Sequence, residues 1–211
     1  MSNFNFGIIK VSEKLYISVF FFAALVLFFL AQGFSFSLIF IICTLLHEFA
    51  HLFFLYRYGA KISKVTLYPF GVDICADTKH LSYKKEIVCT LAGSVSNLVF
   101  AVVSSFVMYF YPTPYLLFFI MCNIFLGAFN LIPLSFFDGG KALRLFLYDR
   151  LDIDRAFYIH KSLDVFSALI FLCFSLFILT GSNFNLSVIC VVIYASVSTF
   201  AAYIKIPCRE P

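Results

Sequence analysis

Long apolar segments constrain the fold of this chain more than any other feature. Six of them, at about 15–31, 36–56, 87–111, 115–133, 163–181 and 186–204, are each long enough to cross a bilayer as a helix, which takes about 20 residues. Charged residues make up only 12% of the sequence, against roughly a quarter in soluble domains. The pattern predicts an all-α polytopic membrane protein with about six transmembrane helices, forming a single domain over residues 1–211 in the lipid bilayer.

Lys and Arg residues occur only in alternate connections between these segments. The three short connections, at 32–35, 112–114 and 181–183, contain none, and all 15 lie in the two tails and the two long loops. The positive-inside rule therefore predicts that both termini and both long loops are cytoplasmic. The basic residues form no contiguous run, so the net charge of +4 does not indicate a nucleic-acid partner.

The long loops contain two shorter patterns. Residues 61–68 alternate and precede Pro69-Phe70-Gly71, which predicts a short strand or small surface β-hairpin after the second helix, although an interfacial loop would show the same alternation. The apolar stretch at about 140–147 predicts an interfacial helix.

No small-residue cleavage site follows the first apolar segment, so we expect a retained helix. The seven cysteines have no C-x-x-C spacing and are expected to be reduced, small core residues.

The second apolar segment contains the sequence His47-Glu48-Phe49-Ala50-His51. Two His four apart lie on one face of a helix and can share a zinc ion, while Glu48 lies about 100° around the helix, within reach of a bound water. With four His and four Glu in 211 residues, the pattern would arise by chance in roughly one such chain in 700. Ionisable groups are costly in an apolar helix, but polar groups that only stabilise helix packing would also account for them.

A catalytic zinc usually takes three protein ligands, so two His leave the site incomplete. The remaining candidates for the third ligand are Asp73, Asp77, His80, Asp138, Asp149, Asp152, Asp154 and His160. Asp138 stands out because it follows the fourth apolar segment, after Pro133 and before Gly139 and Gly140. Proline ends or kinks a helix, and the glycines free the backbone beside the carboxylate. The alternative is that Asp138 caps the next helix.

These motifs together resemble the site-2 protease family of intramembrane metalloproteases. His-Glu-x-x-His is followed about ninety residues later by Asn130-x-x-Pro133-x-x-x-x-Asp138-Gly139, and the Pro69-Phe70-Gly71 turn is similar to the surface hairpin of the family. Residues 92–97 are similar to a further family motif, but Ser94 stands where proline is usual. The resemblance covers about residues 36–145.

The resemblance implies a role for each matching residue. His47, His51 and Asp138 would ligate one Zn²⁺ per chain, Glu48 would be the general acid and base, and Asn130 would hold the substrate backbone or the oxyanion. An interhelical hydrogen bond is the alternative role for Asn130. The implied activity is hydrolysis of a peptide bond in or near the transmembrane segment of a membrane-tethered protein substrate.

Within the family, size and helix number are similar to the minimal six-helix bacterial branch that includes the sporulation factor-processing proteases. We expect neither the peptide-binding insert of other relatives nor the nucleotide-sensing domain that this branch appends. The expected location is a bacterial cytoplasmic membrane, with the active site opening to the cytoplasm. We further expect that the segment Lys61–Tyr68 receives unwound substrate as an added strand.

Two other functions are compatible with His-Glu-x-x-His in a membrane. A prenyl-protein or heat-shock-type membrane protease would take a Glu as third ligand from a later helix, yet the only later Glu residues are Glu86 and Glu210, and neither falls in a suitable helix. A metal-dependent transporter or a non-catalytic membrane-binding protein would bind the metal without needing Glu48 as a base.

Overall fold

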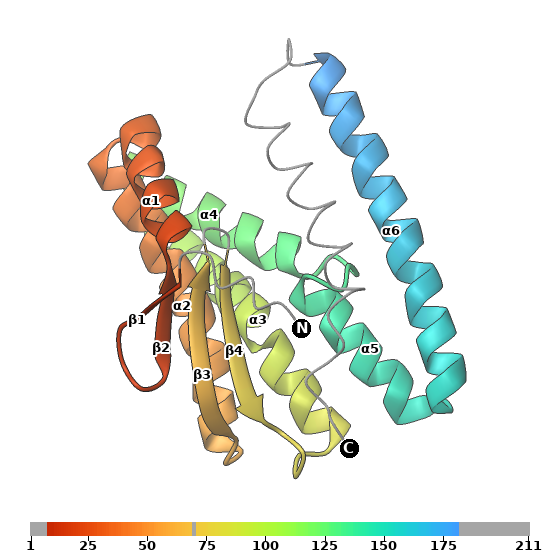
Figure 1. Ribbon diagram of the computed structural model, residues 1–211. Coiled ribbons are helices and arrows are strands. Elements are labelled where there is room, and N and C mark those ends of the chain that lie inside the picture. The colour runs from red at the N-terminus through yellow and green to blue at the C-terminus, as the bar shows by residue number, and fades with distance from the viewer. Residues whose placement is uncertain (1–7, 69–70, 182–211) are drawn as a thin grey trace. The chain divides into compact units, whose positions relative to one another are not determined.

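The computed structural model describes residues 8–68 and 71–181 (Figure 1). The elements are β1 (Ile8–Lys10), β2 (Leu15–Ser18), α1 (Val19–Gln32), α2 (Phe34–Arg57), β3 (Lys61–Tyr68), β4 (Gly71–Asp77), α3 (Tyr83–Phe110), α4 (Pro114–Asn130), α5 (Asp138–Arg150) and α6 (Ile153–Gly181). The chain is mostly helical with one small sheet, as the sequence indicated. It divides into two compact units, Met1–Gly127 and Ala128–Pro211, which are described separately below. The expected sixth segment, 186–204, lies outside the described residues.

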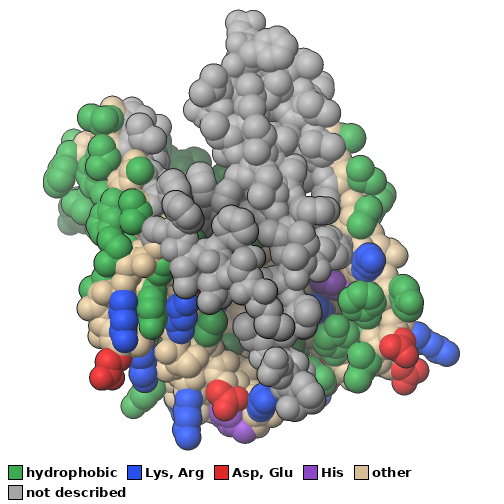
Figure 2. Space-filling model, in the orientation of Figure 1, with side chains coloured by type: hydrophobic (Ala, Val, Ile, Leu, Met, Phe, Trp, Pro, Cys, Tyr) green, Lys and Arg blue, Asp and Glu red, His purple; other side chains and the backbone are tan. Residues whose placement is uncertain are grey.

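Two of the described helices, α2 and α3, are long and apolar enough to cross a membrane. Each carries large hydrophobic side chains on an exposed face, such as Phe49 on α2 and Phe106 on α3, which suits contact with lipid. In Figure 2, hydrophobic side chains cover the upper part of the first unit, over α1 and α2, whereas charged side chains gather at its lower end. This separation of an apolar from a charged end is the pattern of a membrane-embedded protein. The number of six spans stays a prediction.

Several helix boundaries differ from those expected from hydropathy. The first helix begins at Val19 instead of residue 15, because Leu15–Ser18 forms β2; a short apolar run does not by itself distinguish strand from helix. The third helix begins at Tyr83 instead of residue 87, and α6 begins at Ile153 instead of residue 163. In both cases polar residues add one or more helical turns before the apolar stretch.

The fourth helix ends at Asn130, three residues before Pro133 instead of at it. Leu131 and Ile132 donate their backbone N–H groups to the carbonyls of Ala128 and Phe129, at 3.2 Å each. These are bonds to the third residue back, which tighten the end of a helix. Proline disfavours helical geometry in the residue before it, so the chain leaves the helix early and enters the loop that leads to Asp138.

The predicted β-hairpin after the second helix is present but belongs to a larger sheet of four strands, in the order β1-β2-β3-β4. β3 pairs antiparallel with β4 and parallel with β2, while β1 pairs antiparallel with β2. The sheet contacts α1 and α2 (Figure 1). Because β3 is paired on both sides over residues 65–67, the expectation that Lys61–Tyr68 receives an added strand is wrong for that part of the segment.

The interfacial helix expected at about 140–147 is α5, which is longer and begins at Asp138. Its N-cap residue is Phe137, so the alternative in which Asp138 caps the helix is wrong. Asp138 is instead the first residue within the helix, where a negative charge is favoured by the helix dipole.

Candidate metal centre

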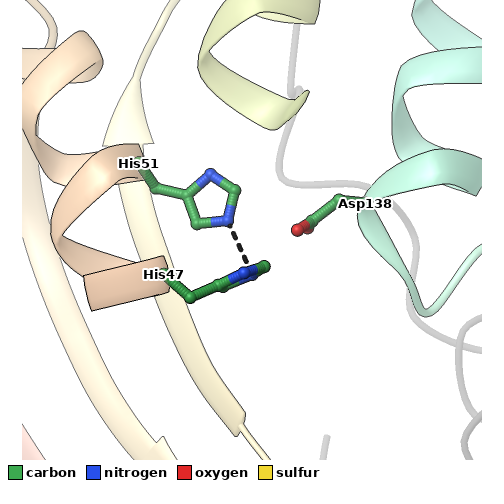
Figure 3. Close-up of side chains that lie close together, drawn as sticks. All are labelled: His47, His51 and Asp138. Atoms are coloured by element: carbon green, nitrogen blue, oxygen red, sulfur yellow. Dashed lines mark hydrogen bonds between the residues drawn. The ribbon is translucent and has the colours of Figure 1, made fainter. Parts of the chain in front are cut away.

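Two imidazoles from α2, those of His47 and His51, are buried within the first unit. The Nε2 atoms of His47 and His51 lie 3.1 Å apart, and their rings meet edge to face with centroids 4.8 Å apart (Figure 3). Two nitrogens that each lie about 2.0–2.1 Å from one tetrahedral zinc would be roughly 3.3 Å apart. The spacing of one helical turn therefore brings the two nitrogens to a separation that suits a shared ion.

The ring of His51 is held by the neighbouring helix. Its Nδ1 lies 2.8 Å from the backbone carbonyl of Cys89 on α3. A carbonyl can only accept, so His51 Nδ1 carries the proton and, in the neutral ring, Nε2 keeps its lone pair. The Nε2 of His47 must then donate in the hydrogen bond between the rings. The bond from His51 Nδ1 to Cys89 is typical of a metal-ligating His, whose second ring N–H usually donates to a carbonyl or carboxylate.

Gly93 on α3 leaves space beside both Nε2 atoms. A Cβ built on Gly93 would clash with the Nε2 of His51 and lie 2.7 Å from the Nε2 of His47. Glycine inside a helix is less stable than alanine by about 1 kcal/mol. Helix α3 is therefore less stable with Gly93 than it would be with alanine, and the space is kept at that cost. The two Nε2 atoms and the space next to them fit a bound metal ion, once the proton on His47 Nε2 has moved away.

Glu48 follows His47 on α2, and its side chain is partly exposed whereas both neighbouring imidazoles are buried. Ser94 is fully buried, and α3 continues without a break from Tyr83 to Phe110. The replacement of the usual proline by serine is therefore accommodated in a continuous helix.

Asp138 belongs to the second unit, where it opens α5 (Figure 3). The residue is 7% exposed, and its Oδ1 accepts from the Nζ of Lys141 at 3.4 Å. A Cβ on Gly139 would clash with the carbonyl of Leu131, and one on Gly140 with the carbonyl of Leu134. Both glycines are thus required by the tight path of the loop before α5. Asn130 is the last residue of α4 and directly precedes the loop, whose other end leads into Asp138.

The other candidate ligands have different surroundings. Asp149 and Asp152 lie near Arg150 and Arg155, each at 3.9 Å, and Asp77 accepts from the backbone N–H of Lys79. His160, which lies before the expected span at 163–181, donates its Nε2 proton to the carbonyl of Gly140 at 3.2 Å. Burial lowers the pKa of His160 below its usual value, which favours the neutral ring that makes this bond.

Sequence reasoning overlooked Asp164, which is 1% exposed. Its two carboxylate oxygens accept from the backbone N–H and the hydroxyl of Ser135, at 2.7 and 2.8 Å. The available signal was an acidic residue in an otherwise apolar segment, one helical turn after His160.

Comparison with known proteins points to one family. Residues 111–173, which include Asn130 and Asp138, match the model of peptidase family M50. Over 142 residues the chain is 31% identical to a zinc metalloprotease of Methanocaldococcus jannaschii, in a match that covers 64% of this chain and 41% of that protein. The chain thus spans less than half the length of this curated relative.

The fold is similar to a solved structure, the site-2 protease from Methanocaldococcus jannaschii. The TM-score is 0.65 at 22% sequence identity, and the match covers 96% of each chain. The resemblance to site-2 proteases drawn from the motifs is confirmed. The match to peptidase family M50 and the apolar helices α2 and α3 indicate an integral membrane protein.

Proposed function

We propose that this chain, a relative of the site-2 proteases of peptidase family M50, is a zinc-dependent intramembrane endopeptidase. It would hydrolyse a peptide bond in or near the transmembrane segment of a membrane-tethered protein. The observation that carries this proposal is the pair of buried imidazoles in an apolar helix, with Nε2 atoms 3.1 Å apart beside the space at Gly93. Ionisable groups within a membrane helix are costly unless they face a polar interior, pair or bind a metal.

The donor set of the site is two imidazoles and one carboxylate, from His47, His51 and Asp138. Three protein ligands of these types are usual for a catalytic zinc, which keeps its fourth position for water or substrate. When bound, one zinc ion would lower the pKa of water at the site and polarise the scissile carbonyl. The family match supports zinc among the metals that accept nitrogen and oxygen ligands.

Two further side chains act on the substrate in this proposal. Glu48 takes the proton of the attacking water and passes it to the leaving amine, which is the task of a general base and then a general acid. Asn130 donates an amide hydrogen bond to the substrate backbone or to the oxyanion that develops during attack. Its position at the end of α4, beside the loop that leads to Asp138, is consistent with that role.

Substrate must unwind before it is cut, because a transmembrane helix keeps its peptide bonds in internal hydrogen bonds. The outer edge of β4 has no strand partner among the described residues, so an unwound peptide could add there as a fifth strand. Proline substitutions at the outward N–H groups of β4 should slow cleavage and leave zinc binding unchanged. Unaltered cleavage in every such variant would end this part of the proposal.

Orientation follows from the basic residues. Both termini, both long loops and the opening of the active site would face the cytoplasm of a bacterial cell, since the Lys and Arg residues lie on that side. Water would then reach the catalytic groups from the charged end of the protein.

The experiment that tests the function compares wild type with Glu48→Gln. Both purified proteins are analysed for metal and then mixed with candidate single-span membrane proteins. We expect both to bind zinc and only wild type to cleave; a chelator should stop cleavage and added zinc should restore it. A transporter or a non-catalytic binding protein would keep its function in Glu48→Gln. Equal cleavage by the two proteins would overturn the proposed mechanism.

A further inference from the structure

Helix α6 presents two buried polar side chains, one helical turn apart, to the segment that carries Asp138. Asp164 is 1% exposed and His160 is 9% exposed. Asp164 accepts two hydrogen bonds from Ser135, three residues before Asp138, and His160 donates one to Gly140, two residues after it. The helix thus holds the chain on both sides of Asp138, and all of these contacts lie within the second unit.

The bonds to Asp164 are of a strong kind. Hydrogen bonds to an ionised carboxylate are about twice as strong as neutral ones, and here one carboxylate binds two donors of a single residue. Burying a charge is costly unless it is hydrogen-bonded. A buried Asp at the start of an apolar stretch therefore indicates a segment whose position matters.

Within the segment before Asp138, the backbone N–H groups of Leu134 and Phe137 donate to the carbonyls of Ile132 and Leu134, at 2.8 Å each. Residues 131–137 form no helix or strand, and the tight contacts of Gly139 and Gly140 are with the backbone of the same loop. Leu134 is 1% exposed and gives the loop an apolar anchor, but an apolar contact sets no direction. Asp164 supplies the direction, since its two bonds fix both the backbone and the side chain of Ser135.

We propose that Asp164 is a positioning residue, which holds the loop of residues 131–137 so that Asp138 is presented in the geometry needed to ligate zinc. The proposal rests on the proposed function, because it assumes that Asp138 is a ligand. Groups that orient metal ligands typically change metal affinity by about 10–100-fold when they are removed. Asp164 would act through Asp138 and touch neither metal nor substrate.

The experiment measures zinc affinity of the full chain by competition with a chromophoric chelator, in wild type, Asp164→Asn and Ser135→Ala. We expect about 10–100-fold weaker binding in Asp164→Asn. The loss should be smaller in Ser135→Ala, which keeps the bond from the backbone N–H to Oδ1. Asp154→Asn, in the exposed first turn of the same helix, is the matched control and should bind zinc as wild type does.

A second pair of variants separates positioning from a general effect on folding. In an Asp138→Ala background, Asp164→Asn should cause no further loss of zinc affinity, because the ligand that it positions is absent. An equal loss in both backgrounds would show that Asp164 acts on the fold as a whole and would overturn the proposal. If Asp164→Asn does not fold, as judged by melting of the zinc-free protein, Ser135→Ala in both backgrounds makes the same comparison.

The outcomes distinguish this proposal from the proposed function. Wild-type zinc affinity in both Asp164→Asn and Ser135→Ala would overturn the positioning role and leave the protease intact. Absence of zinc binding in wild type, or full cleavage by Glu48→Gln, would instead overturn the proposed function.

Discussion

At the scale of single residues, the shared hydrogen bond of His47 and His51 determines what the pair can bind. Because the carbonyl of Cys89 fixes the proton of His51 on Nδ1, the Nε2 of His51 is the better-prepared ligand. His47 must give up the Nε2 proton that it donates to His51 before its own lone pair is available. Metal binding by His47 therefore requires the other neutral tautomer, with the proton on Nδ1 and the lone pair on Nε2.

Asp138→Asn tests the third ligand. An amide oxygen carries no charge and binds zinc more weakly than a carboxylate, so we expect at least about a tenfold loss of zinc affinity. The measurement is metal competition on the purified protein, with Asp152→Asn as the control, since Asp152 is 84% exposed. Wild-type affinity in Asp138→Asn would remove Asp138 from the ligand set.

Asn130→Ala separates catalysis from packing at the end of α4. Loss of a donor to the oxyanion should lower kcat by about 10²–10³-fold, with zinc content unchanged. The measurement is steady-state cleavage together with metal analysis. An Asn130 that only joins helices would lower the melting temperature and leave kcat of the folded fraction unaltered.

At the scale of secondary structure, the sequence predicted the helices α2 and α3 and the hairpin of β3 and β4, but not the strands β1 and β2. The four-residue spacing of His47 and His51 within a long apolar run determined their common face. Strand β2 was missed because Leu15–Ser18 continues directly into apolar α1, and its partner β3 lies more than forty residues later. Asp164 was missed because its partner Ser135 is also distant in sequence, and hydropathy carries no information on pairing.

Gly93→Ala tests the close approach of α3 to the two imidazoles. Alanine favours helix formation by about 1 kcal/mol over glycine, yet its methyl group would occupy the space at both Nε2 atoms. We expect zinc binding and cleavage to be lost while the protein stays folded. Val99→Ala, on an exposed face of α3, is the control and should behave as wild type. Retained zinc in Gly93→Ala would place the metal elsewhere.

At the scale of the whole molecule, the distribution of charge predicts which connections share a side of the membrane. Lys79 lies in the loop before α3 and Thr113 just before α4, at opposite ends of the long apolar helix α3. In a background without the native cysteines, Lys79→Cys should react with an impermeant maleimide only from the cytoplasmic face, and Thr113→Cys only from the other face. Labelling of both from one face would contradict the proposed topology.

The parallel pairing of β2 with β3 limits how many times the chain between them can cross a membrane. Strands that hydrogen-bond side by side lie on the same face of a bilayer, so the polypeptide between Ser18 and Lys61 crosses the membrane an even number of times. That conclusion uses neither charge nor hydropathy. It also imposes an order on assembly, because β3 can pair with β2 only after the chain has passed through α1 and α2.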